Sequence, residues 1–179
     1  YADTDNMEEL QEYYSELKSV PGYKALEAVT PVIGTWDDHD YGLNDRGAEF
    51  AARKASQQVF LDFMGVSESS PRRQQEGVYT AHNYATGEGS VKVLVLDTRY
   101  FRSELKADPS GDKRYVPHDQ TDGTILGEAQ WAWLESELQN SRADFNILVS
   151  SIQVLSGEHG FETWGNFPHE VSRLMEIIA

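Results

Sequence analysis

Apolar residues recur every three to four positions in several stretches of the chain, the spacing typical of helices that bury one face. The clearest stretch is 48–64, where alanines and larger apolar side chains share one stripe and Gly65 follows as a stop. A polar helix is predicted at 5–19, begun by an Asp or Asn cap. Three further helices are predicted, at 21–29, at 127–138 and from Pro168 onward.

Short, almost continuous apolar runs alternate with these helices and predict strands. They lie at 31–36, at 145–151 and within 77–97, where a turn at 86–89 joins two strands. The second strand of that pair and the run at 145–151 are apolar nearly throughout, so we expect both to be buried on both faces. Helices alternating with such strands predict an α/β fold in which helices cover a sheet.

Polar residues follow three of the predicted strands, at 36–40, 97–99 and 150–153. In open α/β sheets ligands bind beyond the carboxyl ends of the strands, so these segments are predicted to form one site. The stretch 103–124, rich in Asp, Pro and Gly, is predicted to be a long loop that carries function.

The 179 residues are about the size of one domain. Tyr1 stands where an initiator methionine is expected, and the final residues stop inside an apolar helical pattern without a cap. We therefore expect residues 1–179 to be the central part of a single domain, truncated at both termini. No apolar run is long enough to cross a membrane, and no signal peptide lies within these residues.

Acidic residues outnumber basic ones, 30 against 15, which gives a formal net charge of -15. Such a charge argues against a nucleic-acid backbone as a partner, and no nucleic-acid-binding surface is expected. The chain has no cysteine, which excludes disulfides, thiolate zinc sites and a cysteine nucleophile.

An acidic cluster, Asp37, Asp38 and Asp40 together with His39, directly follows the first predicted strand. Like charges this close raise one another's pKa unless water or a cation screens them. Carboxylate oxygens with an imidazole suit Mn, Fe, Zn, Mg or Ca. A solvated acidic loop explains the same spacing equally well. An EF-hand does not fit, because the position that requires glycine holds Leu43.

Three segments carry a resemblance to a known family: TWDDHDYGLNDRG at 35–47, VLVLDTRYFR at 93–102, and LGEAQWAWLESEL followed by LVSSIQVL at 126–155. They resemble the PhoD-like alkaline phosphatases of the calcineurin-like metallophosphoesterase superfamily. The resemblance implies a layered α/β sandwich, with helices flanking two mixed sheets, that is incomplete at both ends here. It also implies hydrolysis of phosphate esters by a metal-activated hydroxide at a centre of two metal ions, whose identity among Fe, Ca, Mn, Zn and Mg stays open.

The resemblance assigns roles residue by residue. Asp38 takes the place of a metal-binding asparagine and Asp37 that of the preceding glycine, and both are counted with the metal site. His39 is similar to the histidine that contacts phosphate as a general acid, and Asp40 to the carboxylate that orients it. Tyr1 is implied as a further metal ligand, because it ends a segment similar to the family's Gly-Asp-x-x-Tyr.

Arg99 and Arg102 follow a strand end and could contact phosphate, because a guanidinium matches its oxygens. An alternative is that Arg99 pairs with Asp97 and fixes the loop. The implied substrate is a phosphate ester, and the resemblance suggests export from the cytoplasm. Because further ligands would lie outside these residues, we expect the chain to be inactive alone. A second hypothesis is a non-catalytic acidic domain that binds calcium or a protein partner.

Overall fold

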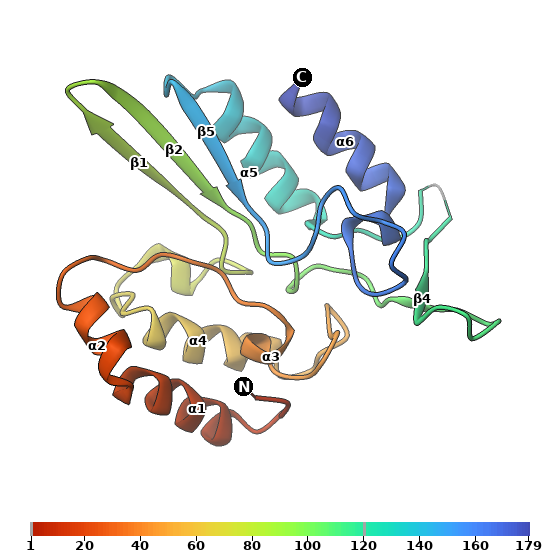
Figure 1. Ribbon diagram of the computed structural model, residues 1–179, viewed down its shortest axis with the longest axis horizontal. Coiled ribbons are helices and arrows are strands. Elements are labelled where there is room, and N and C mark those ends of the chain that lie inside the picture. The colour runs from red at the N-terminus through yellow and green to blue at the C-terminus, as the bar shows by residue number, and fades with distance from the viewer. Residues whose placement is uncertain (1, 120) are drawn as a thin grey trace.

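A three-stranded sheet and two groups of helices make up the computed structural model, which describes residues 2–119 and 121–179 (Figure 1). The helices are α1 Met7–Ser19, α2 Pro21–Glu27, α3 Asp38–Tyr41, α4 Arg53–Phe63, α5 Gly127–Gln139 and α6 Pro168–Ile178, with short 3₁₀ helices η1 Pro71–Arg73 and η2 Trp164–Asn166. The strands are β1 Thr80–Thr86, β2 Gly89–Val95, β3 Lys106–Ala107, β4 Tyr115–Val116 and β5 Phe145–Val149. In the described residues, none of the helices is long and apolar enough to span a membrane.

The strand order in the main sheet is β1-β2-β5. β1 and β2 form an antiparallel hairpin, and β5 runs parallel to β2 after the crossover through α5. One face of the sheet packs against α5 and α6 around a buried core that contains Leu94, Trp131 and Leu134. The predicted α/β character is therefore confirmed for this part of the chain.

A second core lies between α1, α4 and the segment before α3. Trp36 is fully buried there, and its ring centroid lies 4.9 Å from that of Tyr41 and 5.3 Å from that of Phe60. The indole Nε1 donates to Asp97 Oδ1 over 2.8 Å. This hydrogen bond joins the segment before α3 to the end of β2, and so connects two of the three segments predicted to form a site.

Two predicted elements differ from the structure. The segment 31–36 forms no strand with the described residues, and Trp36 fixes it through side-chain packing instead of a ladder. The helix predicted at 48–64 begins only at Arg53. The residues before it contact another segment instead, since the backbone N–H of Ala48 donates to the carbonyl oxygen of Arg102 over 2.7 Å. Within the predicted loop 103–124, β3 and β4 form a small antiparallel pair.

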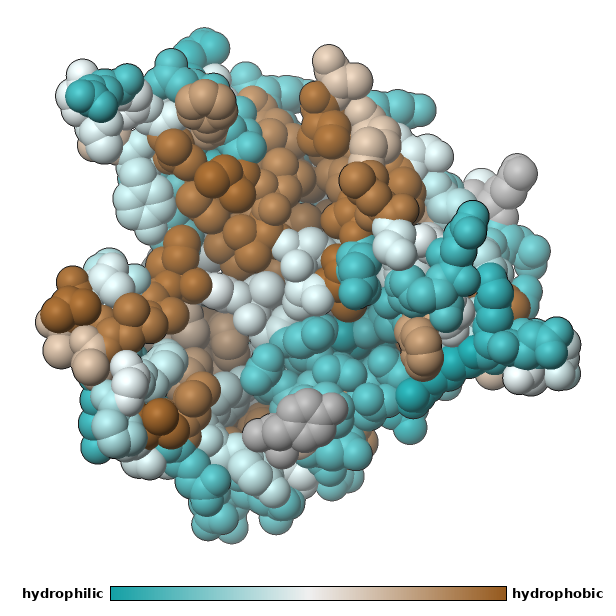
Figure 2. Space-filling view, viewed as in Figure 1, coloured by the Kyte–Doolittle hydropathy of each residue, from teal (hydrophilic) through white to brown (hydrophobic). Residues whose placement is uncertain are grey.

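The prediction that 145–151 is buried on both faces is wrong. In β5, Phe145 is 70% exposed and Ile147 48% exposed, because their side chains point away from α5. In register with them on β2 lie Val91 and Val93, and Tyr84 on β1 is also exposed. Apolar surface gathers over this part of the molecule (Figure 2). We call this side of the sheet the open face.

Candidate active site

The segment Trp36–Gly42 holds the predicted acidic cluster on the short helix α3. The carboxylate of Asp40 accepts the backbone N–H of Asp37 over 3.1 Å, which satisfies one of the donors at the start of the helix. Gly42 then ends the helix with a φ of 153°, and a side chain there would collide with Phe50. The turn is therefore specified locally, and Trp36 anchors it to the core.

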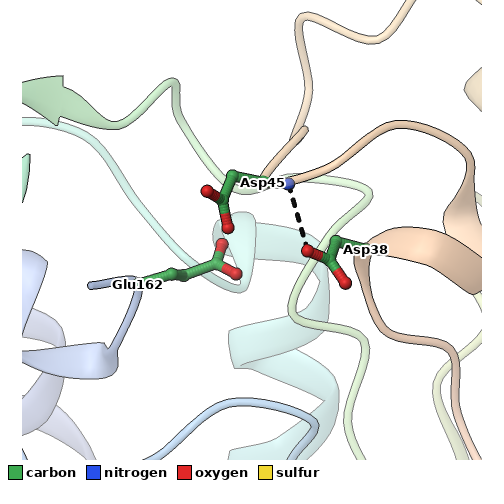
Figure 3. A group of neighbouring side chains, drawn as sticks. All are labelled: Asp38, Asp45 and Glu162. Carbon is green, nitrogen blue, oxygen red and sulfur yellow. Dashed lines mark hydrogen bonds between the residues drawn. The ribbon is translucent and has the colours of Figure 1, made fainter. Parts of the chain in front are cut away.

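Three carboxylates meet beside α3, two from neighbouring positions of one segment and one from the distant loop after β5 (Figure 3). One oxygen each of Asp38, Asp45 and Glu162 lies within 4.8 Å of the other two. Asp45 has a positive φ of 54°, and its N–H donates to Asp38 Oδ2 over 3.2 Å. We call these three residues the acidic group.

Only one member of the acidic group, Asp38, is predicted as a site residue from the sequence. Asp45 lies in the quoted motif TWDDHDYGLNDRG, and the turn-forming pair Asn44-Asp45 was the available signal, consistent with the positive φ of Asp45. Glu162 lies in the loop after β5, and no local sequence pattern distinguishes it from a surface glutamate.

Glu162 is buried against two arginines. Arg99 Nη1 donates to Glu162 Oε1 over 2.7 Å, and Arg102 Nε lies 3.1 Å from the same oxygen. Burial raises the pKa of Glu162, while the charges of the two arginines lower it and burial is the larger effect. The two cations fix the Glu162 carboxylate at the edge of the acidic group.

Arg99 has little capacity left for a substrate in this arrangement. Its side chain is 1% exposed, and its guanidinium also donates to the carboxylate of Asp37, with Nε 3.1 Å from Oδ1. The structure thus places Asp37 against Arg99 and outside the acidic group. Arg99 and Asp97 do contact each other, as the alternative predicted, but through the backbone of Arg99 and not its guanidinium: Asp97 Oδ1 accepts the backbone N–H of Arg99 over 2.8 Å.

His39 lies beside the acidic group, with Nε2 3.9 Å from Asp38 Oδ2. Its Nδ1 contacts the carbonyl oxygen of Ala2, and because a carbonyl only accepts, Nδ1 carries the hydrogen. Nε2 is then the nitrogen that can take up or release a proton. Burial raises the pKa of Asp40, and the charges of Asp37 and Asp38 add to this effect. Tyr1 lies outside the described residues.

The predicted functional loop reaches the acidic group through two side chains at β4. The hydroxyl of Tyr115 donates to Asp45 Oδ2 over 2.8 Å, and Arg114 Nη2 lies 2.9 Å from the same oxygen. Arg114 is half exposed, unlike Arg99 and Arg102. The loop 103–124 thus forms one side of the candidate site.

The acidic group fits a hard divalent cation. Oxygen ligands of Ca²⁺ lie about 2.3–2.6 Å from the ion, so two of them are at most about 5 Å apart. The separations within the acidic group, up to 4.8 Å, satisfy that limit with one oxygen from each residue. An all-oxygen set suits Ca²⁺, Mg²⁺ or Mn²⁺ better than a soft metal.

Comparison with known proteins adds three findings. A family model described as PhoD-like phosphatase matches residues 2–170. Alkaline phosphatase D of Bacillus subtilis (strain 168) is 27% identical over 194 residues, which cover 94% of this chain and 32% of that protein. A solved structure described as "Structure of PhoD" superposes with a TM-score of 0.76 at 22% identity, over 97% of this chain and 36% of that chain. The chain therefore spans about a third of each relative's length.

Proposed function

This chain belongs to the PhoD-like phosphatase family, and from that premise we propose that the full-length protein hydrolyses phosphoric esters with bound metal ions. The observation that carries the proposal is the convergence of Asp38, Asp45 and Glu162 beside His39. Such a site reconciles an anionic substrate with a chain of net charge -15, because metal ions supply the positive field.

The described residues would supply metal ligands and a proton donor. The acidic group would hold one of two ions, with Tyr1 as a further proposed ligand. Asp37 could bind a metal ion only if its carboxylate first broke its ion pair with Arg99. When bound, the ions would supply an activated water nucleophile and neutralise the phosphate oxygens. Among Ca, Mg, Mn, Zn and Fe, the oxygen donors favour the first three, and elemental analysis of the purified protein would identify the ions.

His39 would act as the general acid. Its Nδ1–H donates to the Ala2 carbonyl, which fixes the ring, and Nε2 would deliver a proton to the leaving oxygen. Asp40 would support His39 through α3, since its carboxylate caps that helix. Arg99 would act on phosphate only by giving up Asp37 or Glu162, so we propose that its main role is to position these carboxylates.

We also propose that the open face is the inner face of a two-sheet sandwich, completed by residues outside this third of the family's length. The exposed apolar side chains of β5 support this, because apolar sheet faces pack against another layer. The family resemblance further supports export of the full-length protein, which fractionation of cells would test.

Metal analysis combined with ester hydrolysis tests the enzymatic proposal. Full-length protein purified without chelators should contain metal and hydrolyse p-nitrophenyl phosphate or its bis-ester. Asp38→Asn should lower the metal content, whereas Asp112→Asn, at an exposed aspartate of the loop 103–124, should not. Protein free of metal and without turnover would overturn the proposal.

The alternative of a non-catalytic calcium-binding domain is favoured by the oxygen-only donor set of the acidic group. The same experiment separates the two functions. A single bound calcium ion without hydrolysis of either ester would support the alternative.

A further inference from the structure

Arg114 differs from the other arginines that border the acidic group. Arg99 and Arg102 are 1% and 0% exposed and are held by Glu162, whereas the side chain of Arg114 is 50% exposed. It precedes β4 in the loop 103–124, and its Nε donates to the hydroxyl of Tyr115 over 3.1 Å. Arg114 is thus a half-exposed cation at the rim of the site.

The partner of Arg114 is a carboxylate that a metal ion would also use. Asp45 Oδ2 lies 2.9 Å from Arg114 Nη2, and it also accepts Tyr115 Oη over 2.8 Å and Asn44 Nδ2 over 2.9 Å. A cation in the acidic group would compete for the Asp45 carboxylate and repel the guanidinium, because like charges a few ångströms apart repel.

From this competition we infer that Arg114 exchanges partners: it neutralises Asp45 when no cation occupies the acidic group, and binds an oxyanion of the phosphate ester when one does. The inference rests on the proposed function. It assigns Arg114 as a substrate-binding residue, supplied by the loop 103–124.

Charge and geometry support this exchange. A guanidinium presents paired N–H donors that match phosphate oxygens, and its long side chain can turn about the Nε contact to Tyr115. A chain with a net charge of -15 repels anions, so a released cation at the entrance would favour substrate binding. Arg99 and Arg102 cannot provide it without breaking buried ion pairs.

Arg114→Gln in the full-length protein tests the exchange by two changes of opposite sign. Calcium binding to the metal-free protein, measured by titration calorimetry, should tighten by about threefold, because an exposed competing ion pair is removed. Inorganic phosphate should bind the calcium-loaded variant about tenfold more weakly, because a charged hydrogen-bonding partner is lost. Arg114→Lys should restore part of the phosphate affinity.

Arg173→Gln is the matched control, since Arg173 lies on α6 and pairs with Glu128 and Glu135, away from the acidic group. It should change neither affinity. Unchanged calcium and phosphate affinities in Arg114→Gln would overturn the inference and leave the proposed function intact. A wild-type protein that binds neither calcium nor phosphate would instead overturn the proposed function, and the inference with it.

Discussion

Arg99 Nη1 lies 2.7 Å from Glu162 Oε1, and both side chains are buried at the edge of the acidic group. The pair joins the end of β2 to the loop after β5. A third residue, Asp37, accepts from the same guanidinium, so one arginine positions carboxylates from two other segments. The position of the Glu162 carboxylate in the acidic group therefore depends on buried ion pairs.

Glu162→Gln should lower the free energy of unfolding in EDTA by about 3 kcal/mol. Removing one partner of a buried ion pair leaves the other charge poorly compensated, which costs about 3–5 kcal/mol. We expect the lower end, because Arg99 keeps Asp37. Urea denaturation measures the effect. The exposed Glu158, four residues earlier, provides the control Glu158→Gln, which should stay within about 0.5 kcal/mol of wild type. Equal effects of the two variants would show that the pair adds no stability.

His39→Ala in the full-length protein should lower kcat by at least about tenfold, because general acid catalysis contributes about 10²–10⁴ in rate. Metal content should stay near that of wild type, since no oxygen of the acidic group is removed. Steady-state kinetics with an aryl phosphate and elemental analysis measure the two quantities. His159→Ala, at an exposed histidine that stacks on Phe161, is the control. Normal turnover of His39→Ala would exclude His39 from proton transfer.

The sequence predicted most helices and the β1–β2 hairpin, because these depend on local periodicity and turn residues. It failed at 31–36, where an apolar run forms no strand: Trp36 packs between aromatic rings, and Pro31 has no N–H to donate to a ladder. It also failed for the exposure of β5, since an apolar run does not reveal whether a second layer covers it within the described residues.

Half of the candidate site was predictable from the sequence. The motif around Asp38 and His39 is contiguous, and its charge crowding is visible in the sequence alone. Glu162 and Arg114 were not predictable, because only the fold brings their loops to Asp45. Arg99 follows a strand end, which favours a phosphate contact, but in the structure its guanidinium pairs with the carboxylates of Asp37 and Glu162.

The free energy of unfolding should fall as the pH drops below about 6.5, partly through His82 on β1. Burial lowers the pKa of His82, and the nearby charge of Arg72 lowers it further. The folded state thus favours the neutral ring, so this contribution is complete above the pKa of the unfolded chain and is lost as the pH falls through the folded pKa. Urea denaturation at pH 8 and pH 5 of wild type and His82→Gln measures it. Between pH 8 and pH 5 the free energy of unfolding should fall more in the wild type than in His82→Gln, because only the wild type loses the His82 contribution. Equal falls in the two proteins would contradict the prediction.

Phe145→Ser should destabilise the full-length protein by about 3 kcal/mol if the open face is covered by a second layer, because truncating a buried phenylalanine costs about 3–5 kcal/mol. Phe161→Ser is a matched control, since Phe161 is 60% exposed in a loop and Phe145 is 70% exposed on the sheet. The control should cost less than about 0.5 kcal/mol, as is usual for exposed positions. Chemical denaturation of both variants measures the difference. If both variants lost equally little unfolding free energy, the open face would be exposed to solvent in the full-length protein, and the proposed sandwich would be wrong.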